Sequence, residues 1–463
     1  MEDRLAAPAP TPLRPAPLRI AIAGLGTVGA GVIRLLDTNG TLIAARAGRA
    51  IEVVAVSARD RGKNRGVDIA RFAWEDDMTA LARRADVDVV VELVGGSDGP
   101  ALALSRAALS GGKGLVTANK AMIAHHGMEL AELAEAHHAT LKFEAAVAGG
   151  IPVIKGLREG TSANVLTKVY GILNGTCNYI LSEMEKTGGD FGDVLAEAQR
   201  LGFAEADPAF DIEGVDAGQK LAILAAIGFG TRIDFAGVRI SGITGVRAAD
   251  IAQADALGFV IRLIGEADVE QSPSGPRLLQ RVRPCLVAKG HPLSAVDGPT
   301  NAVVAEGNFS GRLLFQGAGA GDGPTASAVA ADLIDIARDL ARSNGNGGEV
   351  GAPFSIPVAD LEVMPPAEAG NRVGRAYIRF VVADRPGVLA EITAAMRDAG
   401  VSIESLIQKG RPGSLADAGN NDPVLVALVT HDGPEACITE ALRLLEGSTS
   451  LVEPPLVMHI LGE

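Results

Sequence analysis

Apolar positions along residues 18–144 alternate between two periods, one typical of buried strands and one typical of helices. The strand-like stretches are nearly continuous runs of Val, Ile, Leu and Ala, as in Val87–Val94. Continuous apolar strands separated by helices are typical of a parallel sheet that is covered on both faces. We therefore predict an α/β, Rossmann-type domain over residues 18–145. Its strands are expected at 18–23, 51–57, 87–94, 115–117 and 140–144, and its helices at 27–36 and 121–137.

The pattern changes after residue 145 and predicts an α+β domain over residues 146–319. A second glycine-rich segment, residues 315–323, leads into a helix expected at 325–341. We expect this part of the chain, about 320–345, to return to the first domain. Within the α+β domain, strands are expected at 165–173, 278–287 and 301–306, and helices at 179–186, 191–201 and 215–229.

Polar, glycine-rich and proline-rich residues around 346–374 predict a linker before a third domain, residues 375–463. The order there is strand, helix, strand, strand, helix, strand, which is the ferredoxin-like topology. A polar loop, 410–422, separates the second and third strands. Residues 1–17, rich in Ala and Pro, are expected to be a disordered tail. The six elements are expected at 375–383, 388–398, 401–409, 423–431, 435–445 and 457–461.

Composition narrows the class of protein. Forty-two Lys and Arg against 56 Asp and Glu give a net charge of −14, which disfavours a nucleic-acid partner. Cys177, Cys285 and Cys437 are too few for a disulfide framework or a cysteine-based zinc site. No apolar stretch approaches the ~18 residues of a membrane helix. We expect a cytoplasmic enzyme with no membrane partner.

The first chemical motif is Gly24-Leu25-Gly26-Thr27-Val28-Gly29, which follows a strand and opens a helix. In this context the glycines make a tight turn, and the helix N-terminus accepts a pyrophosphate. The following strand ends in Ser57-Ala58-Arg59-Asp60-Arg61-Gly62-Lys63. The cationic side chains of Arg59, Arg61 and Lys63 could bind a ribose 2′-phosphate, which favours NADP as the cofactor. Asp60 keeps NAD possible, because an acidic residue there can bind the ribose 2′-hydroxyl. The ordinary alternative is a solvated loop that binds no ligand.

Two lysines are candidates for proton transfer. Lys120 follows Thr117-Ala118-Asn119 at the carboxyl end of a predicted strand, the edge where such sheets bind ligands. Lys220 lies four residues after Asp216, within an acidic stretch that runs from Glu205 to the start of a buried helix. A surface ion pair is the plain alternative. Burial lowers the pKa of an amine and carboxylates raise it, so their balance decides whether Lys220 exchanges a proton.

Other polar segments are less specific. The segment 173–179 carries polar groups suited to a small ligand, but its Cys177 is expected to be an inert buried thiol. The histidine pairs at 125–126 and 137–138 are expected at the surface. The turn at 383–392 either simply connects two elements or forms a regulatory amino-acid pocket.

Together these motifs resemble homoserine dehydrogenase, in the longer form that carries a C-terminal ACT regulatory domain. The resemblance covers nearly the whole chain after residue 17. It is carried, in this order, by GLGTVG, TANK, FEAAVAGGIP, GILNGTCNYI, AEADPAFDIEGVDAGQKLAIL, FQGAGAGDGPTASAV and the ACT-like DRPGVLAEI.

The resemblance implies NADP(H)-dependent interconversion of L-homoserine and L-aspartate 4-semialdehyde, in threonine, methionine and isoleucine biosynthesis. It also implies threonine as the regulator and a homo-oligomer, a dimer or tetramer. Lys220 and Lys120 match the catalytic lysines, with Lys220 as the proton donor. The implied substrate residues are Glu205, Asp211, Asp216 and Thr176. The implied cofactor residues are Gly24, Gly26, Thr27, Val28, Gly29, Arg59, Lys63, Thr117, Ala118, Lys120 and Gly319. A sodium or potassium site is implied at Glu144, Val147, Gly149 and Ile151.

Two other functions remain open from the residues alone. An acylating semialdehyde dehydrogenase would need an activated thiolate, and Cys177 lacks a base nearby in the sequence. A non-catalytic sensor of NADP and amino acids would keep the glycine turn and the C-terminal domain but would not need both lysines.

Overall fold

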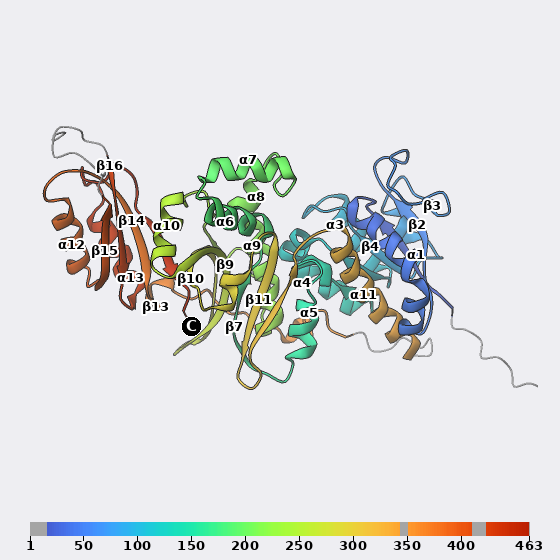
Figure 1. The fold of residues 1–463 in the computed structure, drawn as a ribbon. Helices are drawn as coiled ribbons and strands as arrows, with labels where there is room; N and C mark the ends of the chain where they lie inside the picture. The colour runs from blue at the N-terminus through green and yellow to red at the C-terminus, as the bar shows by residue number, and fades with distance from the viewer. Residues whose placement is uncertain (1–15, 343–350, 410–422, 463) are drawn as a thin grey trace, which may run out of the picture. The chain divides into compact units, whose positions relative to one another are not determined.

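The protein is described by a computed structural model that covers residues 16–342, 351–409 and 423–462 (Figure 1). The chain forms two compact units, Met1–Gly150 with Gly321–Val358, and Ile151–Ala320 with Ala359–Glu463. Residues 1–15 of the expected tail, 343–350 of the expected linker region and the expected loop 410–422 lie outside the described residues. Our domain boundaries stay a prediction.

The described part of the first unit is built on a six-stranded parallel sheet with the order β3-β2-β1-β4-β5-β6. All of its strand pairs are parallel, and β1 lies centrally between β2 and β4. This arrangement confirms the predicted Rossmann-type sheet. The strands are β1 (Leu18–Ala23), β2 (Ile51–Ser57), β3 (Ala73–Trp74), β4 (Val89–Glu92), β5 (Gly114–Thr117) and β6 (Leu141–Lys142).

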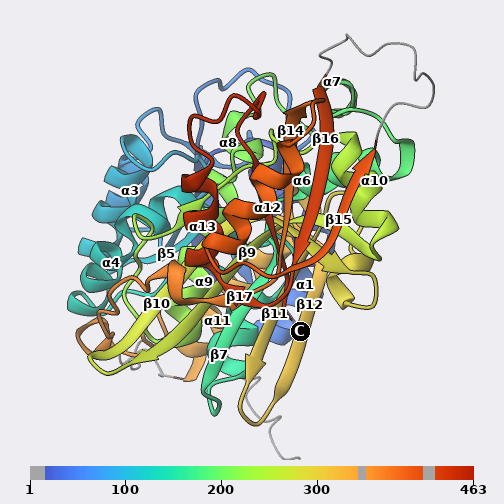
Figure 2. The same cartoon turned by 90° about the vertical axis from the view of Figure 1, so that its left-hand side faces the viewer.

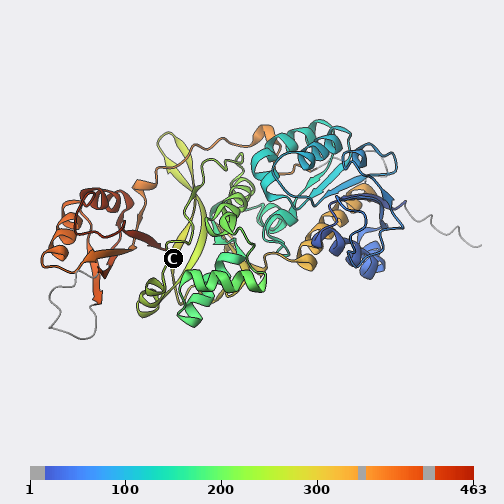
Figure 3. The same ribbon diagram turned by 90° about the horizontal axis from the view of Figure 1, so that it is seen from above.

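Helices cover both faces of this sheet (Figure 3). Helix α1 packs against α11 on one side, and α3 contacts α4. Gly31 of α1 permits the close approach of α11, because a Cβ there would lie 2.9 Å from the Asp322 carbonyl oxygen. The helices are α1 (Thr27–Ala47), α2 (Ala80–Arg83), α3 (Pro100–Ser110), α4 (Lys120–Ala136) and α11 (Asp322–Arg342).

Helix α1 is longer than predicted. The sequence Asp37-Thr38-Asn39-Gly40 resembles a helix end, yet the helix continues to Ala47. Ile43 and Ala47 are buried in the same core as Leu333 and Ile336 of α11. Apolar burial therefore outweighs the weak helix propensity of Asn and Gly at this point.

In the second unit most of the described strands form a ten-stranded mixed sheet, and two further strands form a separate two-stranded sheet. The main path of the ten-stranded sheet is β12-β11-β7-β9-β10-β18-β14-β16-β15, and β8 pairs with β10. The long hairpin of β9 and β10 was only half predicted, because β9 was not recognised. The strands of this unit that precede the C-terminal domain are β7 (Leu166–Ile172), β8 (Arg239–Ile240), β9 (Phe259–Ser272), β10 (Gly275–Ala288), β11 (Thr300–Gly307) and β12 (Gly311–Ala318).

Helix α9 packs on β7, β9 and β10 and is almost wholly buried from Asp216 to Ile227. Gly265 of β9 faces this helix, since a Cβ there would lie 2.8 Å from Leu173 and 3.6 Å from Leu221. The helices of this part are α5 (Val153–Lys155), α6 (Gly175–Thr187), α7 (Phe191–Leu201), α8 (Ala209–Ile212), α9 (Val215–Phe229) and α10 (Ala248–Ala256).

The C-terminal residues form the predicted ferredoxin-like domain, with the strand order β18-β14-β16-β15. Helices α12 and α13 contact each other and share one apolar core with the strands (Figure 2). Strand β18 also pairs in parallel with β10, so the two sheets are continuous. The elements are β13 (Val373–Gly374), β14 (Ala376–Ala383), α12 (Val388–Asp398), β15 (Ile403–Lys409), β16 (Pro423–Thr430), β17 (Gly433–Pro434), α13 (Glu435–Leu444) and β18 (Leu456–Ile460).

None of the helices in the described residues combines the length and the apolar character that crossing a membrane requires.

Candidate active site

The glycine turn between β1 and α1 has a backbone that side chains would obstruct. Gly24 has a φ of 94°, and a Cβ on it would lie 2.5 Å from the carbonyl oxygen of Leu93. A Cβ on Gly29 would lie 2.1 Å from the Gly24 carbonyl oxygen. Both positions therefore require glycine for the fold itself, through a left-handed conformation at one and close packing at the other.

Gly26 is glycine for a different reason. It precedes α1, no described side chain caps the helix there, and a Cβ on Gly26 would meet no atom within 4 Å. The helix therefore presents uncapped backbone N–H groups beside open space, which is what a pyrophosphate requires. Thr27 and Val28 form the first turn of this helix. These residues fit the phosphates of a dinucleotide.

The cationic loop after β2 leaves Arg59 and Lys63 exposed. Arg65, which we did not predict, ties this loop to the glycine turn. Its Nε donates to the Leu25 carbonyl oxygen at 2.9 Å, and another of its nitrogens donates to the Lys63 carbonyl oxygen at 2.7 Å. No sequence pattern distinguishes Arg65 from its cationic neighbours, because only the folded loop brings it to Leu25.

A buried carboxylate organises the neighbouring strand ends. Glu92 at the end of β4 is fully buried, and its carboxylate accepts hydrogen bonds from Thr117 Oγ1 at 2.6 Å and from the Val94 backbone at 2.7 Å. Asn119 caps α4 through the Met122 backbone N–H and donates to the Gly96 carbonyl oxygen. Lys120 follows as the first residue of α4 and is half-buried, while Ala118 lies just before the cap.

Glu92 and Asn119 were not among the predicted site residues. A glutamate within the apolar run Val87–Val94 was the available signal, because a buried carboxylate needs hydrogen-bond donors.

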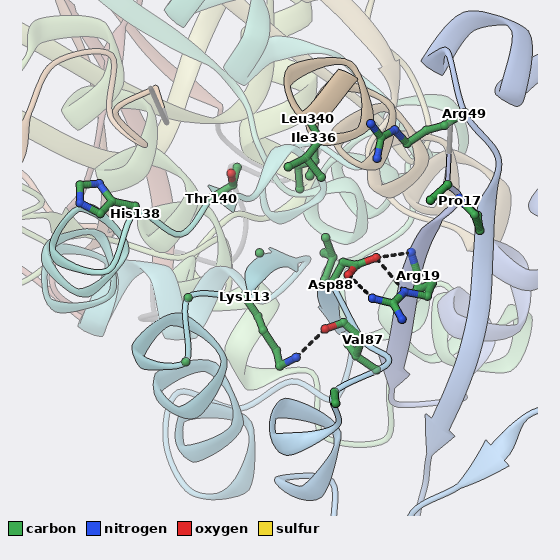
Figure 4. Close-up of a pocket in the computed structure, with 16 residues that line it drawn as sticks. Pro17, Arg19, Arg49, Val87, Asp88, Lys113, His138, Thr140, Ile336 and Leu340 are labelled. Carbon is green, nitrogen blue, oxygen red and sulfur yellow. Dashed lines mark hydrogen bonds and ion pairs between the residues drawn. The ribbon is translucent and has the colours of Figure 1, made fainter. Parts of the chain in front are cut away.

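A cavity of the first unit lies at the opposite edge of the sheet (Figure 4). It has a volume of about 1200 Å³ and is lined by residues at the amino ends of β1, β4 and β5. Arg19 is paired there with Asp88 at 2.8 Å, and Lys113 donates to the Val87 carbonyl oxygen. Because parallel sheets bind nucleotides at their carboxyl ends, this cavity is not the dinucleotide site.

In the second unit a lysine and two aspartates are held together at the start of α9. Lys220 Nζ donates to Asp216 Oδ2 at 2.8 Å and to the Leu173 carbonyl oxygen at 2.7 Å. The side chain of Lys220 is 11% exposed and that of Asp216 is 6% exposed. The ion pair of Asp216 and Lys220 is therefore buried. It is not the solvent-exposed surface pair that was the alternative interpretation of their spacing.

Asn174 links the two aspartates. Its Nδ2 donates to Asp211 Oδ1 at 2.8 Å and to Asp216 Oδ2 at 2.7 Å, and its Oδ1 caps α6 by accepting the Cys177 backbone N–H. Thr176 Oγ1 contacts Asp211 Oδ2 at 3.3 Å. The structure thus brings Thr176, Asp211, Asp216 and Lys220 into one cluster around a residue that was not among our predicted site residues.

The surroundings of this cluster shift the pKa values of Asp211 and Cys177. Burial and the negative charge of Asp216 raise the pKa of Asp211, against the hydrogen bond from Asn174. Burial also raises the pKa of the Cys177 thiol well above its ordinary value, and Asp211 and Asp216 add to this shift. Cys177 therefore stays protonated, as expected of an inert buried cysteine.

The remaining predicted residues have different surroundings. Glu205 is exposed in the loop after α7, where its carbonyl oxygen accepts from Gln199 Nε2 at 3.0 Å. Gly319 follows β12, and a Cβ there would lie 2.2 Å from Asn301. Asn301 itself donates to the Leu173 carbonyl oxygen, the same atom that accepts from Lys220.

The segment around Glu144 is buried. Glu144 is 2% exposed, and its backbone N–H donates to Asp332 Oδ2 at 2.9 Å. Val147 and Gly149 are also buried, and Gly149 has a φ of 54°. Ile151 is the first residue of the second unit. Carboxylate and main-chain oxygens are the donors available along this segment, and such hard oxygens suit an alkali cation.

The histidine pairs lie mostly at the surface, as expected. His125, His137 and His138 are exposed, whereas His126 is half-buried and its Nε2 lies 2.9 Å from Asp98 Oδ1.

A parallel sheet with a dinucleotide turn, a buried lysine held by carboxylates and a C-terminal ferredoxin-like domain together define a class of protein. That class is the nicotinamide-dependent oxidoreductases with an appended regulatory domain. Family models for the NAD-binding domain of homoserine dehydrogenase, for homoserine dehydrogenase itself and for the ACT domain match residues 24–144, 152–334 and 376–443. The chain belongs to the homoserine dehydrogenase family and is an oxidoreductase.

Some similar proteins match over nearly the full length, and a shorter one matches over part of it. Homoserine dehydrogenase of Synechocystis sp. is 41% identical over 446 residues, which cover 96% of this chain and 100% of the relative. The crystal structure of a homoserine dehydrogenase from Thiobacillus denitrificans has a TM-score of 0.87 and 37% identity, covering 97% of this chain and 99% of that one. A hyperthermophilic archaeal homoserine dehydrogenase in complex with NADPH has a TM-score of 0.58 and 26% identity, covering 69% of this chain and 97% of that one.

Proposed function

We propose that the protein interconverts L-homoserine and L-aspartate 4-semialdehyde with NADP(H), in the biosynthesis of threonine, methionine and isoleucine. The observation that carries this proposal is the buried Lys220 ammonium, held by Asp216 and the Leu173 carbonyl oxygen beside Asp211. A positioned ammonium can donate a proton to an alkoxide as it forms from an aldehyde.

In this mechanism the bound nicotinamide supplies the hydride, and the residues of the chain manage the proton and the substrate. Lys220 donates the proton to the developing alkoxide, with Lys120 as a second positive charge. In the reverse direction a lysine takes the hydroxyl proton. Glu205 binds the substrate ammonium, while Asp211, Asp216 and Thr176 line the substrate site. Asp216 also orients Lys220 through its 2.8 Å contact.

NADP is the proposed cofactor, bound through Gly24, Gly26, Thr27, Val28 and Gly29. The exposed cations Arg59 and Lys63 after β2 support a 2′-phosphate, and the archaeal relative is in complex with NADPH. The other proposed cofactor contacts are Thr117, Ala118, Lys120 and Gly319.

The direct test is the absorbance change at 340 nm when the purified protein is given L-homoserine with NADP and then with NAD, each with and without L-threonine. We expect turnover with NADP and inhibition by threonine. Turnover with NAD alone would overturn the cofactor preference but keep the enzyme. No turnover with either, from folded protein that binds NADPH, would instead favour the non-catalytic sensor.

Two variants test the roles of individual residues. Lys220→Ala should abolish most turnover with little change in fold, and unchanged turnover would refute its role.

Glu205→Gln should weaken homoserine binding, which appears as a higher KM. If the affinity for homoserine survives this change, Glu205 is not the ammonium ligand.

The proposal has three further parts. Threonine regulates the enzyme, the protein forms a homo-oligomer, and a sodium or potassium ion binds at Glu144, Val147, Gly149 and Ile151. The ACT domain supports an amino-acid effector. The acylating alternative is disfavoured by Cys177, because a fully buried thiol with a raised pKa is a poor nucleophile.

A further inference from the structure

The carbonyl oxygen of Leu173 accepts hydrogen bonds from two side chains. Lys220 Nζ donates to it at 2.7 Å, and Asn301 Nδ2 donates to it at 3.0 Å. Leu173 is fully buried, and Asn301 is only 1% exposed. Asn301 was not among our predicted site residues, and the proposed function gives it no role. One oxygen atom therefore connects the candidate proton donor to a buried amide.

Strand register brings Asn301 to this oxygen. Strands β7 and β11 pair antiparallel, with Ile172 of β7 opposite Ala302 of β11. Continuing this register by one residue places Leu173, just after β7, opposite Asn301. Gly171 allows the two strands to approach closely, because a Cβ there would lie 2.0 Å from the Ala302 carbonyl oxygen. The pairing of β7 with β11 therefore places the Asn301 side chain beside the Leu173 carbonyl group.

Glycine at position 319 leaves the space that the Asn301 amide occupies. A Cβ on Gly319 would lie 2.2, 2.3 and 2.4 Å from the Cγ, Nδ2 and Oδ1 atoms of Asn301. Side-chain atoms do not pack at such distances, so any larger residue at position 319 would displace the amide. Gly319, which we propose as a cofactor contact, thus has a separate packing role.

Lys220 is held at two points. Its Nζ donates to Asp216 Oδ2 at 2.8 Å and to the Leu173 carbonyl oxygen. An ammonium group has three N–H donors, so a third is left for the substrate, and the two contacts decide where it points. The lysine stem is flexible and does not fix this direction by itself. The orientation of the Leu173 carbonyl group therefore affects the direction of the third N–H group.

We propose that Asn301 is a positioning residue, which holds the Leu173 carbonyl group in the orientation at which Lys220 presents its third N–H group to the substrate. A carbonyl oxygen has two lone pairs, so the Asn301 amide can occupy one while Lys220 occupies the other. Because Asn301 is buried, it acts through this carbonyl group and not on the substrate. The inference rests on the proposed function of Lys220 as the proton donor.

Steady-state kinetics of Asn301→Ala separates positioning from binding. We expect kcat for L-homoserine with NADP to fall at least about tenfold, because a small displacement of a proton donor has a large effect on rate. The KM for homoserine and the dissociation constant of NADPH should change by less than about twofold, because the proposed binding residues stay in place. A kcat within about twofold of the wild type would overturn the proposal. If Asn301→Ala does not fold, Asn301→Ser, whose hydroxyl is too short to reach Leu173, replaces it.

Gly319→Ala disturbs the same amide without removing it. Its methyl group would collide with Asn301, so we expect kcat to fall while the dissociation constant of NADPH stays the same. An unchanged kcat with weaker NADPH binding would show that Gly319 serves the cofactor and not Asn301, and it would contradict the proposal.

A double-mutant cycle combines Asn301→Ala with Lys220→Ala. If Asn301 acts through Lys220, the double variant has the same residual kcat as Lys220→Ala. A purely structural role would multiply the two losses, and that outcome would overturn the proposal. Unchanged turnover in Lys220→Ala would instead refute the proposed proton donor, and this inference with it. The two kinds of failure are therefore distinguishable.

Gln280→Ala is the matched control. Gln280 of β10 is 3% exposed, and its Nε2 donates to the Asp234 carbonyl oxygen at 2.9 Å. Like that of Asn301, its amide oxygen has no hydrogen-bond partner among the described residues. Both variants lose a buried amide, so their melting temperatures should fall alike, but only Asn301→Ala should lose kcat. An equal loss of kcat in Gln280→Ala would show that the effect is not specific to Asn301 and would overturn the proposal.

Discussion

Asn174 holds the geometry of the lysine–carboxylate cluster through three hydrogen bonds. One amide group bridges Asp211 and Asp216 and also caps α6, which begins at Gly175. Asp216 in turn holds Lys220 Nζ. The amide N–H group that donates to both carboxylates stabilises their negative charges, although the charge of Asp216 still raises the pKa of Asp211.

We predict that Asn174→Ala lowers kcat by on the order of 100-fold, because misplacing a proton donor by about 1 Å has an effect of that size. The pH dependence of kcat should also shift, since Asp211 and Asp216 lose a shared donor. Steady-state kinetics over a range of pH measures both effects. Asn308→Ala, on an exposed loop residue, is the control. An unchanged kcat and pH profile would show that Asn174 has no positioning role.

Asp211 should make stability depend on pH. Its pKa is raised in the folded protein, mainly by burial, so its ionised form opposes folding. That cost is present in full above the folded pKa and disappears as the pH falls toward the unfolded value of about 4. Asp211→Asn should therefore melt at an equal or slightly higher temperature than the wild type at pH 8. The difference should vanish near pH 4 in calorimetric scans, and a variant less stable at pH 8 would contradict this assignment.

At the scale of elements, the turn from β1 into α1 contains two glycines that the fold requires and one, Gly26, for which we propose that the ligand is the reason. Gly29 packs on the Gly24 carbonyl oxygen, whereas Gly26 faces open space. The same hexapeptide therefore contains two different physical constraints, which a sequence motif does not distinguish.

Gly26→Ala and Gly29→Ala form a matched pair. We expect Gly26→Ala to unfold like the wild type but to bind NADPH about tenfold more weakly or worse, because its methyl group takes space meant for phosphate. Gly29→Ala should lose about 2 kcal/mol or more of stability through its backbone clash. Urea unfolding and fluorescence titration with NADPH measure the two effects. Equal NADPH affinity in Gly26→Ala and the wild type would remove Gly26 from the phosphate site.

At the scale of the whole molecule, a buried ion pair joins the ACT domain to helix α10 of the same unit. Arg379 of β14 contacts Asp250 of α10, and Tyr377 Oη donates to Asp250 Oδ1 at 2.9 Å. Arg379 is 4% exposed and Asp250 is fully buried. Burial raises the pKa of Asp250, against the charge of Arg379.

We predict that Arg379→Met destabilises the protein by about 3 kcal/mol at pH 8, because it leaves a buried carboxylate without its counter-ion. The loss should be smaller at pH 5, where Asp250 can take up a proton as its pKa rises further. Urea unfolding at the two pH values measures this difference. Arg443→Met, which removes an exposed pair with Glu440, should change stability by less than about 1 kcal/mol. Equal destabilisation at both pH values would contradict the role given to Asp250.

Local pattern was sufficient for most elements of this protein. Strands β1 and β2 and helices α7, α9 and α12 have the bounds that hydrophobic periodicity predicts. Parallel pairing and the ferredoxin-like order followed from the sequence of elements, since short connections allow few topologies. The second half of α1 was missed because it depends on α11, which is distant in the chain. Strand β9 was missed although its hairpin partner β10 follows after only two residues.

The residue types of the candidate site were also readable from the sequence, because glycine turns and lysines among acids carry their chemistry locally. Tertiary structure alone decided which of these groups meet. It brought Asn174 to Asp211 and Asp216, buried Lys220 against the Leu173 carbonyl oxygen, placed Arg65 on the glycine turn and gave Glu92 its donors. The physical reason is that burial and hydrogen-bond partners, which set charge and position, arise from contacts between residues far apart in the chain.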